Sequence, residues 1–226
     1  MTLAKGILAS GIFAASVIIA HNAHAFSPVQ SMIVPMNIAP TAESSTPIVL
    51  KNDSFSDQNG QAYLQTGFIE KEMAGVWVRV PSEIKKFKVD YFRVLMGSGY
   101  ASRDNELTNT QIYFQMGVRD QMATSIPNDI ENVAAITPGP YWNDIPATGD
   151  AGKLDCATGG EYVGAALEFA HSGAPSVFRD LDGIASTQGN VLFAIPGGWN
   201  YSVAYGLRGD WVLRVVGHEA AEGECK

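Results

Sequence analysis

Apolar and polar residues alternate in short runs from Pro47 to Val216, and glycine, proline, asparagine and aspartate separate the runs. A period of two predicts half-buried antiparallel strands, because successive side chains of a strand point to opposite faces. After residue 25 no stretch shows the 3.6-residue period of an amphipathic helix. The alternation predicts strands at residues 47–50, 62–69, 76–80, 87–96, 111–119, 162–169, 190–195, 202–205 and 210–216. The long connection between residues 119 and 161 is expected to hold one or two further short strands, such as 132–136.

The run at 87–96 changes its apolar phase. Apolar residues are spaced by two up to Tyr91, and the spacing starts again at Phe92 and continues to Met96. An extra residue in one strand of a pair turns the following side chains to the opposite face. We therefore expect a β-bulge in this strand.

The number of predicted strands favours a single all-β domain. About eight or nine short strands joined by turn signals are typical of an antiparallel β-sandwich or jelly roll. A chain of 226 residues is long enough to bury a sizeable core in one such domain. The predicted fold is an all-β, jelly-roll-like antiparallel β-sandwich over residues 47–226, preceded by a signal peptide at 1–25 and an extended leader at 26–46.

The first 25 residues have the features of a secretory signal peptide. A single charge, Lys5, precedes an apolar stretch from Gly6 to Ala20, and an Ala-x-Ala sequence ends at Ala25. The apolar stretch is shorter than the roughly 20 residues that a membrane-spanning helix needs. We expect cleavage near Ala25 and a periplasmic or extracellular protein without a transmembrane span.

Two cysteines, Cys156 and Cys225, follow the predicted signal peptide. An even number of cysteines in an oxidising compartment is most simply explained by a disulfide. The alternative, a reactive thiol, needs a base nearby, and His171 and His218 are the only histidines after residue 25. We expect a Cys156–Cys225 disulfide that holds the C-terminal tail.

Composition and charge narrow the range of functions. With 46% hydrophobic and 17% charged residues, the chain is a globular protein rather than a disordered or fibrous one. Its formal net charge of -8 disfavours binding to nucleic acid or to anionic lipid surfaces. The sequence has no Gly-x-Ser-x-Gly, His-Glu-x-x-His or P-loop signature. These observations favour a non-catalytic protein.

Three segments within residues 50–216 form a recognisable pattern. The first is Asp57–Pro81 and the second is Phe87–Gly97. The third and most specific contains Asp180-Leu181-Asp182-Gly183, then Gly198-Trp199, then Gly206-Leu207-Arg208-Gly209-Asp210-Trp211. Together they resemble a family of uncharacterised secreted β-sandwich domains from bacteria. The resemblance implies a secreted or surface-associated jelly-roll-like domain, similar in outline to binding and adhesion modules.

Asp180 and Asp182 form a candidate metal site. They stand two residues apart before Gly183, a spacing that lets two carboxylates face one calcium ion in a loop. The next ligand positions of an EF-hand loop are occupied by Ile184 and Val191, so further ligands must come from elsewhere. The alternative is that both aspartates shape a turn by accepting backbone hydrogen bonds. A structural calcium is therefore one of two open interpretations.

The same region contains arginines that can pair with carboxylates. Arg214 falls on the same strand face as Asp210, two steps further along. We expect Arg179 or Arg214 to pair with Asp180 or Asp210, as a structural clamp or as part of a ligand site.

Four aromatic residues lie in or beside the predicted loops: Trp142, Trp199, Tyr201 and Tyr205. Flat rings in such positions can stack on the apolar faces of sugars. The alternative is that the rings cap the ends of the sandwich core. We treat the four residues as candidate glycan-binding residues.

These features together predict a secreted, non-catalytic β-sandwich module that binds an extracellular glycan or a cell-surface protein. A first alternative is a structural or assembly component of the cell envelope or extracellular matrix, in which residues 26–46 add a strand to a neighbour's sheet. A second alternative is a secreted glycoside hydrolase, because 23 acidic residues allow many carboxylate pairs and none stands out.

Overall fold

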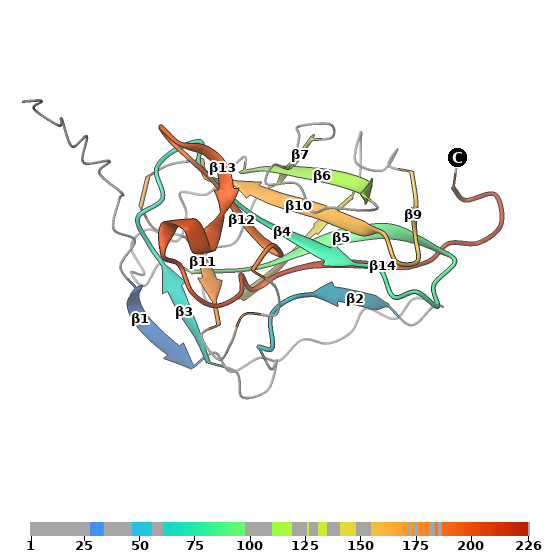
Figure 1. Ribbon diagram of the computed structural model, residues 1–226, viewed down its shortest axis with the longest axis horizontal. Coiled ribbons are helices and arrows are strands. Elements are labelled where there is room, and N and C mark those ends of the chain that lie inside the picture. Colours follow the sequence, from blue (N-terminus) through green and yellow to red (C-terminus); the bar gives the residue numbers. More distant parts are fainter. Residues whose placement is uncertain are drawn as a thin grey trace, which may run out of the picture.

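The computed structural model consists of two antiparallel β-sheets that pack face to face, which confirms the predicted all-β sandwich (Figure 1). Within the part of the chain that the structure describes, no helix has the length and apolar character needed to cross a membrane. The described residues are 28–33, 47–55, 61–97, 110–118, 126, 131–134, 141–147, 155–170, 172–173, 176–180, 184 and 187–225.

The larger sheet has eight strands and is organised around β5, its longest strand. The strand order is β1-β3-β11-β5-β14-β2, and β8 and β9 also pair with β5. Its strands are β1 (Pro28–Ile33), β2 (Ile48–Lys51), β3 (Gln61–Gln65), β5 (Lys86–Gly97), β8 (Tyr141–Pro146), β9 (Ala157–Thr158), β11 (Ser176–Arg179) and β14 (Leu213–Glu219).

Strand β1 comes from the predicted leader and pairs antiparallel with β3. Part of the leader is therefore an edge strand of the sheet in its own chain. The assembly alternative needs the same strand to pair with a neighbouring molecule, and it stays a prediction.

The smaller sheet has six strands in the order β13-β12-β4-β10-β6-β7. In Figure 1, β6 and β10 lie in the layer opposite β2 and β14. The strands of this sheet are β4 (Met73–Arg79), β6 (Thr110–Val118), β7 (Glu131–Ala134), β10 (Tyr162–Glu168), β12 (Asn190–Ala194) and β13 (Gly198–Tyr201).

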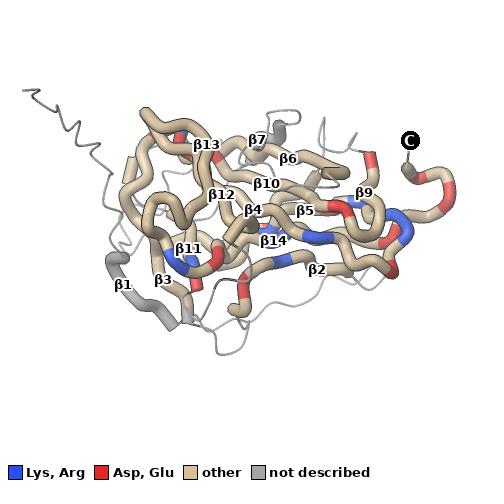
Figure 2. The backbone as a smooth tube through the Cα atoms, in the orientation of Figure 1, with Lys and Arg blue, Asp and Glu red and all other residues tan. Residues whose placement is uncertain are grey.

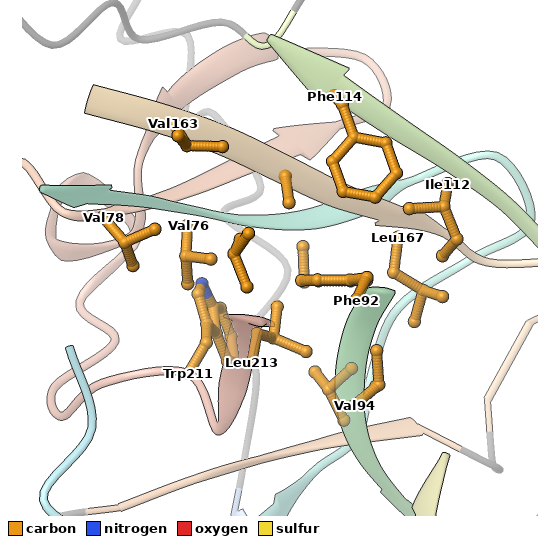
Figure 3. Close-up of a cluster of buried hydrophobic side chains, with 14 of the residues drawn as sticks. Val76, Val78, Phe92, Val94, Ile112, Phe114, Val163, Leu167, Trp211 and Leu213 are labelled. Atoms are coloured by element: carbon orange, nitrogen blue, oxygen red, sulfur yellow. The ribbon is translucent and has the colours of Figure 1, made fainter. Parts of the chain in front are cut away.

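The main core lies between the two sheets, where inward side chains of both layers meet (Figure 3). Alternate residues of β4, β6 and β10 face alternate residues of β5 and β14, as the period-two pattern requires. Removing this apolar surface from water is the main stabilising contribution to the fold. The side chains labelled in Figure 3 are Val76, Val78, Phe92, Val94, Ile112, Phe114, Val163, Leu167, Trp211 and Leu213.

A β-bulge in β5 is confirmed, although it lies at Asp90 and not between Tyr91 and Phe92, where the apolar phase changes. Val216 of β14 pairs with Tyr91, but the next residue, Gly217, pairs with Val89, so Asp90 is the extra residue. The Asp90 carbonyl oxygen accepts a hydrogen bond from the backbone nitrogen of Ala147. The bulge thus keeps both halves of β5 facing the core and presents the Asp90 side chain outside it.

One predicted strand is wrong, because residues 202–205 form the 3-10 helix η3 (Ser202–Tyr205). The chain leaves β13 and turns back here, and the backbone of Gly206 has φ 74°, a value that glycine adopts without a steric cost. The hydroxyl of Ser202 is buried and donates to the carbonyl oxygen of Asn190. These local contacts favour a turn over an extended strand.

Candidate functional site

The outer face of the six-stranded sheet, on the side away from the main core, is a second apolar surface. Trp77 stands out of phase with Val76 and Val78 in β4, so its ring lies on this outer face, where only 1% of the residue is exposed. The buried cluster on this face consists of Met73, Trp77, Tyr113, Ile126, Ala166 and Val191.

Two glycines give this face its shape. A Cβ atom added at Gly75 would lie 2.8 Å from Cδ1 of Ile126, and one added at Gly164 would lie 2.8 Å from Cζ3 of Trp77. The rigid Trp77 ring cannot give way, so Gly164 needs glycine for close packing, whereas a Cβ atom at Gly75 would require the Ile126 side chain to move. Ile126 therefore covers β4, and the Trp77 ring lies against the backbone of β10.

Strand pairing places four half-buried side chains and the buried Met73 in one row across this face. Trp199 pairs with Phe193, Phe193 with Met73, and Met73 with Glu168. Leu167 of β10 pairs with Ile112 of β6. Because these strands are antiparallel, the next residue of β10, Glu168, lies opposite Gln111. We call these five residues the Trp199 row: Trp199, Phe193, Met73, Glu168 and Gln111.

The two ends of the Trp199 row differ in chemistry. At the β13 end, the rings of Phe193 and Trp199 have centroids 5.7 Å apart and are tilted by 58°. At the β6 end, the hydroxyl of Tyr113 lies 2.7 Å from Oε2 of Glu168 and 2.5 Å from Oε1 of Gln111. The row thus joins an aromatic pair to a group of hydrogen-bonding side chains.

Two further polar atoms on this face lack partners among the described residues. Trp77 Nε1 and Gln115 Oε1 are both buried without a hydrogen bond. Trp77 and Gln115 pair with Gly164 from opposite sides, so a donor and an acceptor lie on the same part of the face.

This face carries little charge. Arg79 and Glu168 are the only charged residues of β4, β6, β10, β12 and β13, and the sixth strand of the sheet, β7, contains Glu131. In Figure 2 the labelled strands β6, β10 and β12 are mainly uncharged, whereas charged residues are more frequent around β14 and near the C-terminus. A face with few charges and with aromatic and amide groups suits a neutral ligand.

The structure brings together two of the four predicted aromatic residues. Trp199 and Tyr201 both pack at the edge of the outer-face cluster. Tyr205 lies in η3 and packs against the main core, where burial, and then the Glu72 carboxylate, raise the pKa of its hydroxyl. Trp142 lies on β8 of the other sheet, 6.1 Å from the Phe55 ring and 4.5 Å below the Arg214 guanidinium carbon.

Sequence reasoning missed Phe193, Glu168 and Gln111. Each belongs to a predicted strand and points away from the core. Its position in the alternation of apolar and polar residues therefore indicated that it lies on an outer face. The phase alone does not show that the three residues share a row, because that depends on how strands far apart in the sequence pair.

Asp180 of the candidate calcium site is buried, and both of its carboxylate oxygens accept backbone hydrogen bonds. Oδ2 accepts from the backbone nitrogen of Ser54 at 2.8 Å, and Oδ1 accepts from that of Asp210 at 3.1 Å. Asp182 lies outside the described residues. No group of three His, Cys, Asp or Glu residues in the described chain is arranged to hold a metal ion. A structural calcium stays a prediction.

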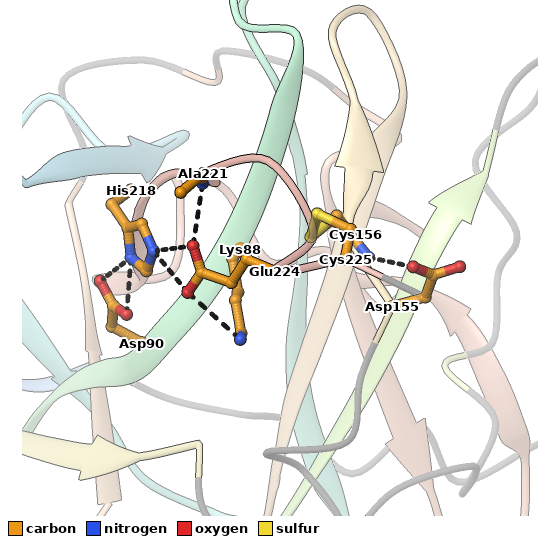
Figure 4. A network of polar contacts seen from close by, with 8 residues as sticks. All are labelled: Lys88, Asp90, Asp155, Cys156, His218, Ala221, Glu224 and Cys225. Carbon is orange, nitrogen blue, oxygen red and sulfur yellow. Dashed lines mark hydrogen bonds and ion pairs between the residues drawn. A yellow bond between two sulfur atoms is a disulfide. The ribbon is translucent and has the colours of Figure 1, made fainter.

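A polar network joins the C-terminal tail to the bulge of β5 (Figure 4). His218 Nδ1 lies 2.8 Å from Oδ1 of Asp90, and Nε2 lies 3.0 Å from Oε1 of Glu224. Lys88 Nζ is 3.2 Å from the same Glu224 oxygen, and the backbone nitrogen of Ala221 donates to the other. The predicted Cys156–Cys225 disulfide is confirmed and lies next to this network.

The network shifts the pKa of both His218 and Glu224. Burial alone lowers the pKa of His218, but hydrogen bonds to Asp90 and Glu224 outweigh it and raise the pKa above 6.5. The backbone hydrogen bond from Ala221 and the contact with His218 lower the pKa of Glu224 to about 2. The two carboxylates on either side of the ring therefore favour its imidazolium form.

Replacing His218 with asparagine is expected to destabilise the protein most at moderately acidic pH. The raised pKa means that the His218 contribution is complete below 6.5 and is lost as the pH rises through the folded-state pKa. The Glu224 contribution is present above 4.5 and is lost only as the pH falls toward 2. Between these limits we expect a loss of about 1 kcal/mol, or roughly 2–4 °C in melting temperature.

Thermal unfolding of the wild type and His218→Asn across this pH range tests the expectation. Glu222→Gln is the control, because it removes an exposed charge from the same tail. A difference between wild type and His218→Asn that stays constant up to high pH would contradict an imidazolium at this position.

Comparison with protein-family models, with curated protein sequences and with solved structures gives no match. The resemblance to secreted bacterial β-sandwich domains therefore stays a prediction.

Proposed function

We propose that this protein is a secreted, non-catalytic β-sandwich module that binds a neutral extracellular glycan on the outer face of its six-stranded sheet. The observation that carries the proposal is the half-buried aromatic group of Phe193, Trp199 and Tyr201, which lies on two strands without charged residues, β12 and β13, at the edge of the sheet. Sugar rings combine apolar faces with hydroxyl groups, so they need both ring surfaces and hydrogen-bonding groups.

The position of these residues supports binding rather than a purely structural role. Phe193, Trp199 and Tyr201 pack against the buried cluster from its edge and remain half exposed, whereas Trp77 and Tyr113 at its centre are buried. Rings held on one side by a packed cluster lose little conformational freedom when a ligand covers the other side. Assembly through β1 and glycoside hydrolysis remain alternative predictions.

The disulfide supports the proposed location outside the cytoplasm, because such bonds persist in oxidising compartments. The predicted signal peptide, residues 1–25, lies outside the described residues.

Replacing Trp199 with alanine is expected to weaken glycan binding by about tenfold or more, since buried tryptophan contacts in binding sites contribute about 2 kcal/mol. The measurement is a neutral glycan array followed by titration calorimetry, run with calcium and with EDTA. The control is Tyr91→Ala, which removes a half-buried ring from the other sheet.

Both variants are first compared with the wild type by thermal unfolding, so that a loss of fold is not mistaken for a loss of binding. If the wild type binds a neutral glycan and Tyr91→Ala reduces that binding while Trp199→Ala does not, the site lies elsewhere. If the wild type binds no neutral glycan, the proposed function is wrong.

A further inference from the structure

The Trp199 row crosses the strands of the six-stranded sheet instead of running along one of them. Its members come from β13, β12, β4, β10 and β6, which are neighbours in that order. Four strand spacings separate the first and last residues, which corresponds to about 19 Å. A ligand that contacts both ends must therefore be extended.

From these positions we infer that the glycan is a neutral oligosaccharide laid across the strands along the Trp199 row, with one end on Trp199 and Phe193 and the other on Glu168 and Gln111. This inference rests on the proposed function, and it specifies the chemical class of the ligand and its orientation relative to the strands. A single sugar ring reaches only one end of the row, so binding at both ends requires a chain of several units.

Each end of the row provides one kind of recognition. The Trp199 and Phe193 rings offer apolar surface, which stacks on any sugar without reading its hydroxyl groups. The Glu168 carboxylate and the Gln111 amide lie beside each other, because both contact the Tyr113 hydroxyl. Both groups can also form hydrogen bonds with sugar hydroxyls. Met73 between them is buried and flexible, so it gives an apolar floor that fits different sugars.

The carboxylate also sets the charge of the ligand. Glu168 is the only acidic residue of the five strands, and Arg79, their only basic residue, lies at the opposite end of β4 from Met73. An acidic glycan along the row meets the Glu168 charge without a compensating cation in these strands, and like charges repel. Uncharged sugars avoid this cost.

Tyr162 provides a test of direction. It lies on β10, the strand of Glu168, but six residues away, which places it about 20 Å along the strand. It is half-buried and packs at the edge of the same apolar cluster. A glycan laid along β10 contacts Tyr162 and Glu168, whereas one laid along the Trp199 row contacts Glu168 and not Tyr162.

The experiment measures binding of neutral cello-, chito-, xylo- and manno-oligosaccharides, from two to six units long, to the full-length protein by titration calorimetry. We expect affinity to rise at least tenfold with length. Glu168→Ala should weaken binding of the six-unit chain by about tenfold, as expected for hydrogen bonds to a charged group, and leave the two-unit chain nearly unchanged. Trp199→Ala should weaken binding of both, and Tyr162→Ala should affect neither.

A second variant, Glu168→Gln, keeps an acceptor for the Tyr113 hydroxyl and is expected to retain more binding than Glu168→Ala. If Trp199→Ala weakens binding but affinity depends neither on oligosaccharide length nor on Glu168→Ala, the glycan does not follow the Trp199 row. The inference is then overturned, and the proposed function stands. If Tyr162→Ala weakens binding of the long chain, the ligand follows the strand and the inference is overturned. If no oligosaccharide binds to the wild type, both the inference and the proposed function fail.

Discussion

Replacing Asp53 with alanine is expected to lower the free energy of unfolding by about 3–5 kcal/mol, the usual cost of removing one partner from a buried ion pair. Asp53 and Arg214 form such a pair, with side-chain exposures of 0% and 3%. Arg214 Nη2 lies 2.6 Å from Oδ1 of Asp53, and its Nε lies 3.1 Å from Oδ2. The variant leaves a buried guanidinium without this carboxylate.

The expected loss does not mean that the pair itself contributes this much stability. Burial raises the pKa of Asp53 above its ordinary value, although Arg214 and Lys51 act in the opposite direction. The desolvation of the carboxylate therefore opposes its attraction to the two cations, and the nearby Asp180 charge acts in the same direction as the desolvation. Replacing both partners with apolar residues of similar volume should cost far less than replacing one.

The matched control is the double variant Asp53→Leu/Arg214→Met, which removes both charges and keeps apolar volume beside the Trp142 ring. Urea unfolding of the wild type, the single variant and the double variant gives the three free energies. We expect the double variant to lie within about 1–2 kcal/mol of the wild type. A double variant as unstable as Asp53→Ala would show that packing, and not the unpaired charge, sets the cost.

The Asp53–Arg214 pair also shows where sequence reasoning reached its limit. The same-face spacing of Arg214 and Asp210 suggested a partner near the C-terminus, but the buried partner in the structure is 161 residues away in the sequence. The Asp180 carboxylate accepts hydrogen bonds from the backbone nitrogens of Ser54 and Asp210. The backbone nitrogen of Asp180 in turn donates to the carbonyl oxygen of Asp210, so these bonds hold neighbouring segments together. Spacing along a strand identifies shared faces, whereas contacts between distant segments depend on strand order.

The same limit applies to the candidate site. Alternation placed the core side chains of residues 162–169 and 211–215 correctly, because every residue of a strand faces one of two sides. It did not reveal that Trp142 and Trp199 lie on different sheets, since nothing in local spacing reports which layer a strand joins. The short strands β8, β11 and β13 were missed, because none of these segments of four to six residues has a regular alternation of apolar and polar residues.

The disulfide was predictable because two cysteines allow a single pairing, and it carries the second large expected effect. Replacing both cysteines with serine should lower the free energy of unfolding by about 4 kcal/mol in the chain-entropy model. The bond links residues 69 positions apart, so its removal frees a long loop in the unfolded chain. With about 2–4 °C per kcal/mol, the melting temperature should fall by roughly 8–16 °C.

The native tail should remain in place in the Cys156→Ser/Cys225→Ser variant, because other contacts hold it. The Ala220 backbone nitrogen donates to the Lys86 carbonyl oxygen, and Glu224 keeps its contacts with His218 and Lys88. The loss of stability should therefore come mainly from a more expanded unfolded state, and the urea m-value should rise.

The measurement is urea unfolding of the wild type and the double serine variant, each with and without a reducing agent. Reduction should lower the stability of the wild type toward that of the variant and leave the variant unchanged. An unchanged m-value together with a large loss of stability would contradict the unfolded-state explanation. In that case the bond acts on the native tail, and His218→Asn should then destabilise the variant more than it destabilises the wild type.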